Sequence, residues 1–578
     1  MTAPDQPVLR IGNCSGFYGD RLSAMREMLE GGPLDVLTGD YLAELTMLIL
    51  GRDLTKDPSA GYARTFVSQV EDTLGLALER GVRIVGNAGG LNPAALAARL
   101  REVADVLGLR PVIAHVQGDD LRARSTELGY PGALTANAYL GAGGIAAALT
   151  AGADIVVTGR VSDASLVVGP AMAHFGWGPT SYDALAGATV AGHVIECGTQ
   201  ATGGNFSGFL SLPRDGRPLG FPVAEVAADG SCVITKHPGT GGAVTVDTVT
   251  AQLMYEIQSE RYLGPDVTTR LDTVSLAQVE ADRVSISGVR GEAPPSTLKV
   301  CVNELGGYRN TLEFVLTGLD VDAKADWLQA QLGPALHAES VTWTRVDLGA
   351  PGADTEEGAS CLLRCTVTDP AADAVGKAFT APAVALALAS YPGFTMTGPP
   401  APATPYGVYR AAYVDRASVT QVVVMPDGSR FEIADQIEEI DVAPAPSADS
   451  AGPSTAARPS TGPTVEAPLG TFVHARSGDK GGDANLGLWV AHDGSRRYDA
   501  RVAWLLDFVT EARIRELVPE AAGLAVDVVP LPNLGGVNVV LHGLLGEGVA
   551  ASTRFDPQAK GLGEWVRSRV VDVPEVLR

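Results

Sequence analysis

Short apolar runs alternate with segments of helical periodicity over roughly the first 230 residues. Strands are predicted at 8–11, 35–38, 83–85, 111–116 and 154–158, because each is a short apolar run bounded by glycine or polar residues. Helices are predicted from about residue 20, over 41–50 and over 94–106, the last with Asn92 as N-cap and Pro93 as the first helical residue. This alternation predicts a parallel sheet with helices on both faces.

The pattern changes after about residue 230. Strands are predicted at 232–235, 297–302, 311–316 and 340–344, with helices near 246–257, 323–331 and 383–390 between them, which indicates an α+β layer. Residues 442–468 are rich in Pro, Ala and Ser and predict an extended linker. The remaining residues predict strands at 486–491, 525–529 and 536–542 and helices at 502–517 and 562–569, an order that suits a ferredoxin-like split βαβ domain.

The predicted fold class is therefore α/β, with a large N-terminal domain and a small ferredoxin-like C-terminal domain. A chain of 578 residues is too long for one hydrophobic core, which also requires several domains. The expected boundaries are 1–441, with an α/β part at 1–230 and an α+β part at 231–441, then the linker at 442–468 and the C-terminal domain at 469–578.

Composition limits the classes of binding partner and the cellular compartment that we expect for this protein. The net charge of −24 disfavours nucleic acid and anionic membranes, and an anionic substrate would need a local basic pocket, although the acidity could equally serve solubility. No run of about 18 apolar residues and no N-terminal signal pattern occurs, so we expect a cytoplasmic protein. Six scattered cysteines without a CxxC pair indicate neither a zinc site nor a disulfide framework. Few aromatic residues and many small-residue helices favour a homo-oligomer.

Loops at the predicted carboxyl edge of the sheet combine glycines with polar residues. Glycine turns that enter helices present free N–H groups and a helix dipole to an anion, so loops converging on this edge predict a ligand site. The substrate-binding candidates in these loops are Asn13, Ser15, Asp20, Arg21, Asn87, Gly89, Gly90, Asn137, Thr202, Gly203, Gly204 and Asn205. No loop matches a P-loop, and no GxGxxG follows the first strand, so no nucleotide cofactor is assigned.

The segment from His474 to Gly487 has the highest density of charged and amide groups among glycines. Arg476 and Lys480 would bind an anionic group there, Asp479 and Asn485 are further substrate-binding candidates, and Lys480 is also a catalytic candidate. The alternative is a tight β-turn whose polar residues face water.

Further candidates each have a structural alternative. Cys14 lies where a helix dipole could make it a nucleophile, or it is a small buried residue. Arg160 and Asp163 follow the predicted strand at 154–158 and would clamp a ligand or transfer protons, or form a salt bridge or helix cap. Lys236 and His237 would cradle a phosphate or carboxylate, or lie in a solvated turn.

His193, Glu196 and Cys197 are spaced at i, i+3 and i+4. On a helix they would share one face, as an acid–base or metal cluster does, although a packed helix face is the default for such a spacing. Glu196 is the candidate for proton transfer, and we assign no metal ligand.

Together these segments resemble the acyclic terpene utilisation (AtuA-like) family. The resemblance rests on GNCSGFYGDR, GNAGG, TANAYLG, TGRVSDASL, HVIECGTQATGGNF, KHPGTGG and HARSGDKGGDANLG, and spans most of 8–440 and 469–570. It implies a large α/β domain with a ferredoxin-like C-terminal domain. It also implies a setting in pathways that degrade branched terpenoid acids as CoA thioesters.

Three functional hypotheses follow. The first is an enzyme that hydrates, hydrolyses or cleaves a branched acyl substrate that is CoA-linked or otherwise carboxylated. The second is a non-catalytic accessory protein that binds an acyl-CoA carboxylase or a ligand. The third is a metal-dependent hydrolase that uses His193, Glu196 and His115.

Overall fold

The computed structural model describes residues 8–346, 353–434 and 462–578. It divides into two compact units, the first made of Met1–Asn303, Tyr409–Val549 and Gln558–Arg578 and the second of Glu304–Val408 and Ala550–Pro557. The N-terminal segment 1–7 and most of the predicted linker, 442–461, lie outside the described residues. Within the described ranges, none of the helices has the length and hydropathy needed to span a bilayer.

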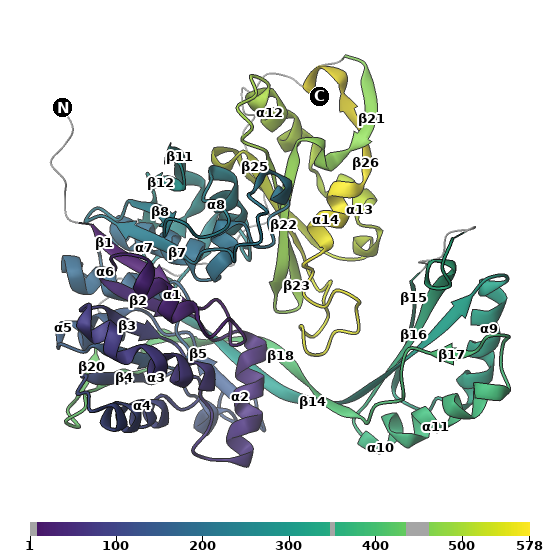
Figure 1. Cartoon of the computed structure of the whole chain (residues 1–578), viewed down its shortest axis with the longest axis horizontal. Coiled ribbons are helices and arrows are strands. Elements are labelled where there is room, and N and C mark those ends of the chain that lie inside the picture. Colours follow the sequence, from purple (N-terminus) through teal and green to yellow (C-terminus); the bar gives the residue numbers. More distant parts are fainter. Residues whose placement is uncertain (1–7, 347–352, 435–461) are drawn as a thin grey trace. The chain divides into compact units, whose positions relative to one another are not determined.

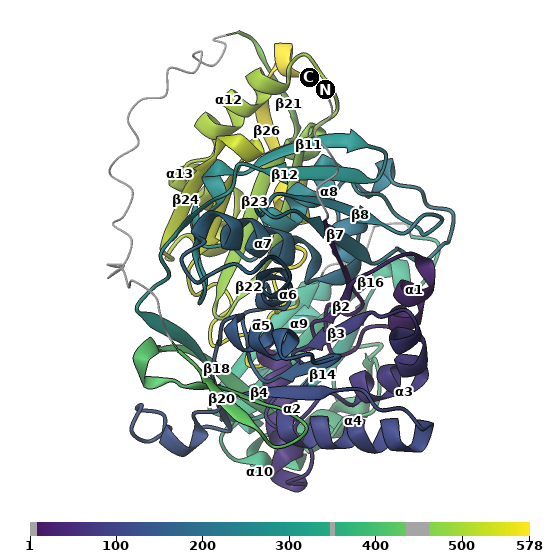
Figure 2. The ribbon, with the colours of Figure 1, turned by 90° about the vertical axis from the view of Figure 1, so that its left-hand side faces the viewer.

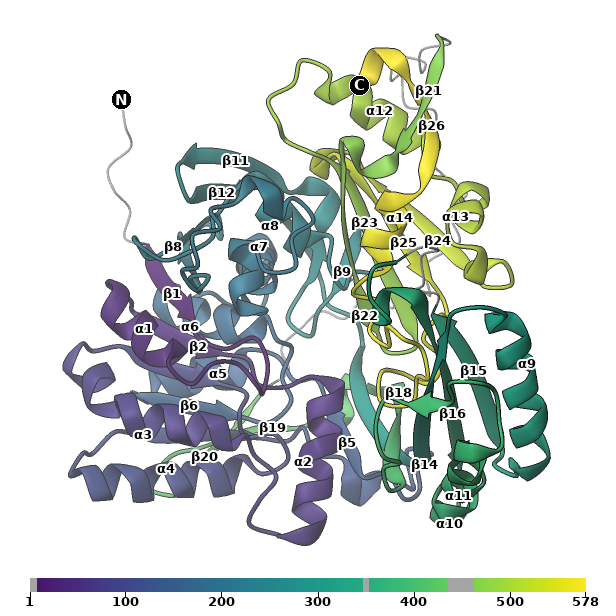
Figure 3. The same cartoon turned by 45° about the vertical axis from the view of Figure 1, so that its right-hand side comes forward.

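The first unit is built on an 11-stranded sheet with the order β11-β12-β8-β7-β1-β2-β3-β6-β4-β19-β20 (Figures 1 and 3). Its five central strands are parallel, which confirms the predicted parallel sheet: β1 (Leu9–Asn13), β2 (Val36–Gly39), β3 (Arg83–Gly86), β6 (Ile155–Thr158) and β4 (Ile113–Gln117). Antiparallel strands extend both edges: β7 (Pro222–Val226), β8 (Cys232–Lys236), β12 (Arg283–Ser287) and β11 (Ser275–Glu280) on one, and β19 (Gln421–Val424) and β20 (Arg430–Ile433) on the other.

Successive residues of the central strands face two separate hydrophobic cores. Ile155 and Val157 lie in the core that contains α1 (Ala24–Gly31), α3 (Arg64–Glu79) and α4 (Pro93–Leu107), whereas Val156 lies in the core that contains α5 (Gly143–Thr150), α6 (Ser165–Phe175) and α7 (Tyr182–Ile195). The start of α4 is as predicted, because Asn92 accepts a hydrogen bond from Ala95 N (3.2 Å) and Pro93 opens the helix. Two further helices, α2 (Glu44–Lys56) and α8 (Val246–Leu253), lie in the same unit.

The second unit is entered through one long strand. The two strands expected at 297–302 and 311–316 form a single strand, β14 (Thr297–Thr317), in which residues 300–303 pair with β5 (Thr135–Ala138) and residues 308–317 pair with β16 (Ser360–Asp369). The rest of its secondary structure comprises β15 (Ser340–Val346), β17 (Thr395–Met396), β18 (Thr404–Asp415), α9 (Val321–Leu332), α10 (Ala372–Val375) and α11 (Lys377–Ala385). Cys361 and Cys365 lie on β16.

The C-terminal domain belongs to the first unit, except for Ala550–Pro557. Its four-stranded sheet has the order β22 (Val473–Lys480), β23 (Asp483–Val490), β25 (Gly536–Leu541) and β24 (Val526–Leu531), and every pair in it is antiparallel (Figure 2). It is therefore built from two hairpins and lacks the parallel pair of a split βαβ. Helices α12 (Tyr498–Phe508), α13 (Glu511–Leu517) and α14 (Leu562–Ser568) accompany it.

Two boundaries in this domain differ from the prediction. The helix expected over 502–517 is two helices, since Thr510 is extended and caps α13 by accepting from Arg513 N (3.2 Å). The last residues of the predicted linker form β21 (Thr464–Pro468), which pairs with β26 (Val570–Pro574).

Candidate functional site

Polar side chains gather at the carboxyl ends of the parallel strands, as the sequence predicts. Asn87, which follows β3, donates to Asp40 Oδ1 (2.6 Å) and accepts from Tyr41 N (2.8 Å), both of which follow β2. Asn13, at the end of β1, donates to Glu196 O (3.3 Å). Neighbouring strand ends are thereby joined into one buried polar layer.

Arg160 places a buried positive charge in this layer. Its side chain is 1% exposed and donates to Val161 O (2.8 Å) and Leu42 O (3.1 Å), and it pairs with Asp163. The guanidinium also lies 4.6 Å from the centre of the Tyr139 ring. Asp163 is therefore the salt-bridge partner that fixes Arg160, which was the structural alternative for this pair.

Asp40 is a residue of this layer whose pKa lies near neutral pH. Burial raises its pKa to about 7, with Glu196 adding to the rise and Arg160 and Asn87 opposing it. A carboxyl group with such a pKa suits general acid–base work. The sequence analysis missed Asp40, although it directly follows a strand end and the strand-edge rule would have found it.

Glu196 and His193 form a buried pair next to Asp40. Glu196 lies just beyond the end of α7, and its Oε1 is 3.2 Å from His193 Nδ1. Both side chains are more than nine-tenths buried, yet Glu196 Oε2 and His193 Nε2 have no hydrogen-bond partner among the described residues. A buried oxygen without a partner is available to a substrate group or a water.

The metal hypothesis gains no support from the side-chain geometry. Among the described residues, no three His, Cys, Asp or Glu side chains are grouped so that they could hold a metal ion. His115 lies on β4, with its Nε2 3.0 Å from Gln117 Nε2. Burial raises the pKa of Cys197, which disfavours its thiolate as a ligand.

The C-terminal domain contributes a β-hairpin to the same electrostatic neighbourhood. The segment from His474 to Gly487 forms most of β22 and β23, which meet at a Gly481–Gly482 turn. Burial alone would raise the pKa of Glu44, but Lys299 and Lys480 outweigh it and lower that pKa to about 2. The side chain of Lys480 forms no hydrogen bond or ion pair with any other described residue, so its ammonium is available to a ligand.

Asp479, which precedes Lys480, has a carboxyl group whose pKa is raised like that of Asp40. Burial raises its pKa to about 7, Glu256 and Glu44 add to the rise, and Lys560 opposes it. The hairpin therefore carries a proton-exchanging carboxyl group beside a free ammonium group.

Arg476 and Asn485 attach the hairpin to the N-terminal part of the unit. Arg476 donates to the Gln200 side chain and lies 4.1 Å from the centre of the Tyr255 ring. Asn485 accepts from Glu256 N (2.8 Å) and donates to Asn538. These contacts make both residues docking groups of the hairpin, and the substrate-binding role predicted for them stays a prediction.

The glycines of the hairpin allow it to pack closely against the rest of the unit. A Cβ atom on Gly478 would lie 2.3 Å from the Tyr255 ring, and one on Gly481, whose φ is +67°, would lie 2.7 Å from the Tyr409 ring. The backbone therefore approaches aromatic side chains more closely than any other residue allows. Their density reflects this packing, whereas the sequence analysis attributed it to ligand binding.

Two family models match the chain, one described as "Acyclic terpene utilisation family protein AtuA" over residues 9–425 and one as "AtuA ferredoxin-like domain" over 467–572. The first covers well over half of the sequence. The chain belongs to the acyclic terpene utilisation family AtuA. No curated protein and no solved structure matched it.

Both AtuA family regions contribute to the site. Asp40, Arg160 and Glu196 lie in the region of the AtuA model, and Asp479 and Lys480 lie in the AtuA ferredoxin-like domain. The second family model also confirms the ferredoxin-like class predicted for the C-terminal domain.

The structure disfavours the roles predicted for three residues of this AtuA-family chain, Cys14, Lys236 and His237. Cys14 is buried, and burial raises the pKa of its thiol to about 12, so it is protonated at neutral pH and is a poor nucleophile. Lys236 Nζ pairs with Asp282 (3.2 Å) and donates to Thr240 O (3.0 Å). His237 Nε2 lies 3.0 Å from Met28 O. These contacts occupy the groups that would have cradled an anion.

The remaining loop candidates make internal contacts that shape the strand-edge turns. Most of their polar groups bond to nearby loops: Ser15 to Phe17 O, Asp20 to Gly16 N, Arg21 to Glu27 and Thr202 to Gly220 O. Asn205 O accepts from Arg476 of the C-terminal domain. Gly89 donates to Thr158 O (2.9 Å), and Gly90, Gly203 and Gly204 lie in turns closed by backbone hydrogen bonds. Asn137 is the exception, because its Oδ1 is buried and has no partner among the described residues.

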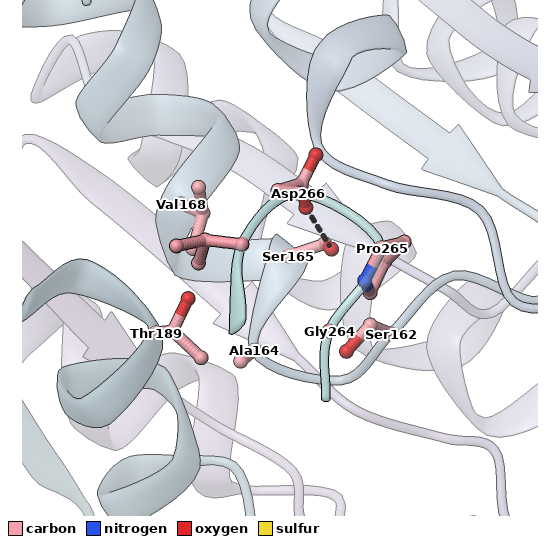
Figure 4. Close-up of a pocket in the computed structure, with 9 residues that line it drawn as sticks. Ser162, Ala164, Ser165, Val168, Thr189, Gly264, Pro265 and Asp266 are labelled. Atoms are coloured by element: carbon pink, nitrogen blue, oxygen red, sulfur yellow. Dashed lines mark hydrogen bonds between the residues drawn. The ribbon is translucent and has the colours of Figure 1, made fainter. Parts of the chain in front are cut away.

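A small cavity lies beside the start of α6, apart from these groups (Figure 4). Ser165 donates to Asp266 Oδ2 (3.1 Å) at its wall, and the same carboxylate accepts from Ala142 N (2.9 Å). The cavity volume is about 10 Å³, enough for at most one water molecule. It is too small for an organic substrate.

Proposed function

We propose that the protein is an enzyme of branched, terpenoid-type acyl or carboxylic acid catabolism. It would hydrate, hydrolyse or cleave a C–C bond of an anionic, CoA-linked substrate by proton transfer. The family description supports the terpene setting. The observation that carries the catalytic part is the pair of carboxyl groups, Asp40 and Asp479, whose pKa values burial raises to about 7 in one neighbourhood of basic residues.

Proton transfer would be divided among three carboxyl groups. Each of these reactions moves protons to or from oxygen or carbon, and a catalyst works best when its pKa lies near the operating pH. Asp40 and Asp479 satisfy that requirement. Glu196, with Oε2 unpartnered, would accept a hydrogen bond from a water or a substrate hydroxyl.

The anionic part of the substrate would bind to Lys480. A chain with a net charge of −24 repels anions at long range, so binding one requires cations close by. Among the described residues, Lys480 forms no side-chain hydrogen bond or ion pair, and it acts with Lys299 on one carboxylate, Glu44. Arg160 is already hydrogen-bonded to the backbone and paired with Asp163. It would therefore add a fixed positive charge to the site without binding the substrate directly.

Incubation of the purified protein with branched and unsaturated acyl-CoAs and their free acids, followed by mass spectrometry, tests this proposal. A gain of water, a lost fragment or free CoA is expected, and Asp40→Asn and Lys480→Ala should each reduce turnover by about 100-fold or more. The matched control is Asp326→Asn, an exposed carboxylate on α9 that bonds no described residue.

Two results would contradict the proposal. One is full turnover in both site variants. The other is an unchanged mass for every compound together with a raised melting temperature, which would point to the non-catalytic, ligand-binding alternative.

A further inference from the structure

Asp247 connects the two parts of the first unit through a single carboxylate. It is the second residue of α8 and accepts three hydrogen bonds from the C-terminal domain, from Trp489 Nε1 (3.0 Å), His492 N (3.1 Å) and His492 Nδ1 (2.8 Å). Its side chain is 15% exposed. The principal contacts of this carboxylate are therefore with residues at and just beyond the end of β23.

His474, on β22, helps to hold the same end of the hairpin. It pairs with Trp489 across β22 and β23, and its Nε2 lies 4.0 Å from Asp247 Oδ2. Its Nδ1 lies 3.0 Å from Ser207 Oγ, in the N-terminal part of the unit. The His474–Trp489 pair is thus held from two sides by residues that belong to another domain.

The opposite end of this hairpin carries the proposed catalytic groups. The register runs from the His474–Trp489 pair to the Lys480–Asp483 pair, six residues along β22. At the rise of a β-strand this is about 20 Å. Between the two ends, Asn485 and Arg476 keep the hairpin docked by contacts that do not involve Asp247.

We propose that Asp247 is a positioning residue of the candidate site: by holding the His474–Trp489 end of the hairpin it sets where Asp479 and Lys480 lie relative to Asp40 and Glu44. The inference rests on the proposed function for its kinetic consequence only. Its structural consequence, the orientation of the hairpin, is independent of any substrate.

The length of the hairpin sets the expected size of the effect. A tilt of about 5° at one end of a 20 Å strand moves the other end by nearly 2 Å. A displacement of about 1 Å in a catalytic group can reduce a rate about 100-fold. Loss of the Asp247 carboxylate should therefore lower kcat by between about tenfold and 100-fold while the domains stay docked.

The test compares Asp247→Asn with Asp183→Asn in the full-length protein. Asp183 is also the second residue of a helix, α7, and accepts from Gly291 N (2.9 Å) and Arg290 Nη1 (2.6 Å), both outside the C-terminal domain. Hydrogen exchange of residues 473–490 is the readout that needs no substrate. We expect faster exchange there in Asp247→Asn and unchanged exchange in Asp183→Asn.

The pH–rate profile separates positioning from general destabilisation. When the hairpin shifts, Asp479 gains water and moves away from Glu44, so the limb of the profile that reports it should move to lower pH. A loss of stability alone would lower the fraction of active protein without moving the limb. His492→Gln, which changes a partially exposed partner of Asp247, should reproduce both effects and serves if Asp247→Asn fails to fold.

Hairpin exchange that stays at the wild-type rate in both Asp247→Asn and His492→Gln would overturn the inference. So would an equal increase in Asp183→Asn. If the wild-type protein turns over none of the acyl compounds, the proposed function fails, but hydrogen exchange still decides whether Asp247 holds the hairpin.

Discussion

Asp40→Asn should stabilise the protein at high pH, because the wild-type chain keeps a carboxyl group where its ionised form is unfavourable. Burial raises the pKa of Asp40 from 3.8 to about 7 in the folded state. Between these two values the folded state binds a proton that the unfolded state has released. The free energy of unfolding therefore falls as the pH rises through this interval and stays low above it.

The size of the effect follows from the two pKa values. Each pH unit between them costs about 1.4 kcal/mol, which gives about 4 kcal/mol once Asp40 is fully ionised. Asparagine has the same shape and carries no charge, and its amide oxygen can still accept from Asn87 and Leu42 N, as Asp40 Oδ1 does. The variant should match the wild type near pH 4 and exceed it by up to about 4 kcal/mol at pH 8.

Urea unfolding of the wild type, Asp40→Asn and the Asp326→Asn control at several pH values measures this difference. Subtracting the two curves removes the other titrating groups, which both chains share. A difference between Asp40→Asn and wild type that does not change with pH would refute the reasoning. Stabilisation combined with loss of turnover would show that the chain keeps Asp40 for function at a cost in stability.

The remaining predictions concern single residues. Cys14 in the native protein should resist iodoacetamide at pH 8, because burial raises the pKa of its thiol to about 12; peptide mass mapping before and after urea checks this, and native labelling would contradict it. Gly481→Ala should cost about 1–3 kcal/mol in urea unfolding, since φ is +67° and the new methyl group would meet Tyr409, whereas Gly523→Ala, with no atom within 4 Å, should cost far less. Arg160→Met should cost about 3–5 kcal/mol in the same assay, because it removes the buried cation that faces Asp40 and pairs with Asp163, and a neutral result would contradict a stabilising role for this charge.

The main sheet could be predicted because local signals determined it. Alternating apolar runs and helices identified the five parallel strands, and the Asn92-Pro93 pair identified the start of α4. The continuous strand β14 could not be predicted, because the Gly306-Gly307 pair has the local character of a turn. Pairing of residues 300–303 with β5 and of residues 308–317 with β16 extends the strand on both sides of that glycine pair, and neither partner is visible from the local sequence.

The site could be predicted only in part. The strand-edge rule found Asn13, Asn87 and Arg160, and it would also have found Asp40, which directly follows the last residue of β2. The approach of the hairpin to Glu44 has no signature in the sequence, because it depends on how two distant domains pack. Raised pKa values depend on burial, which a single sequence does not reveal.

Strand β19 has a consequence for the order in which this chain can fold. It pairs with β4 through Val422 and Gln117, about 300 residues apart. Without β19 and β20, β4 would be an edge strand of the sheet. During synthesis the backbone groups of β4 on that side stay unpaired until most of the chain has left the ribosome. The nascent protein therefore presents an open sheet edge for many seconds, the period in which chaperone binding and mispairing between neighbouring chains compete with completion of the fold.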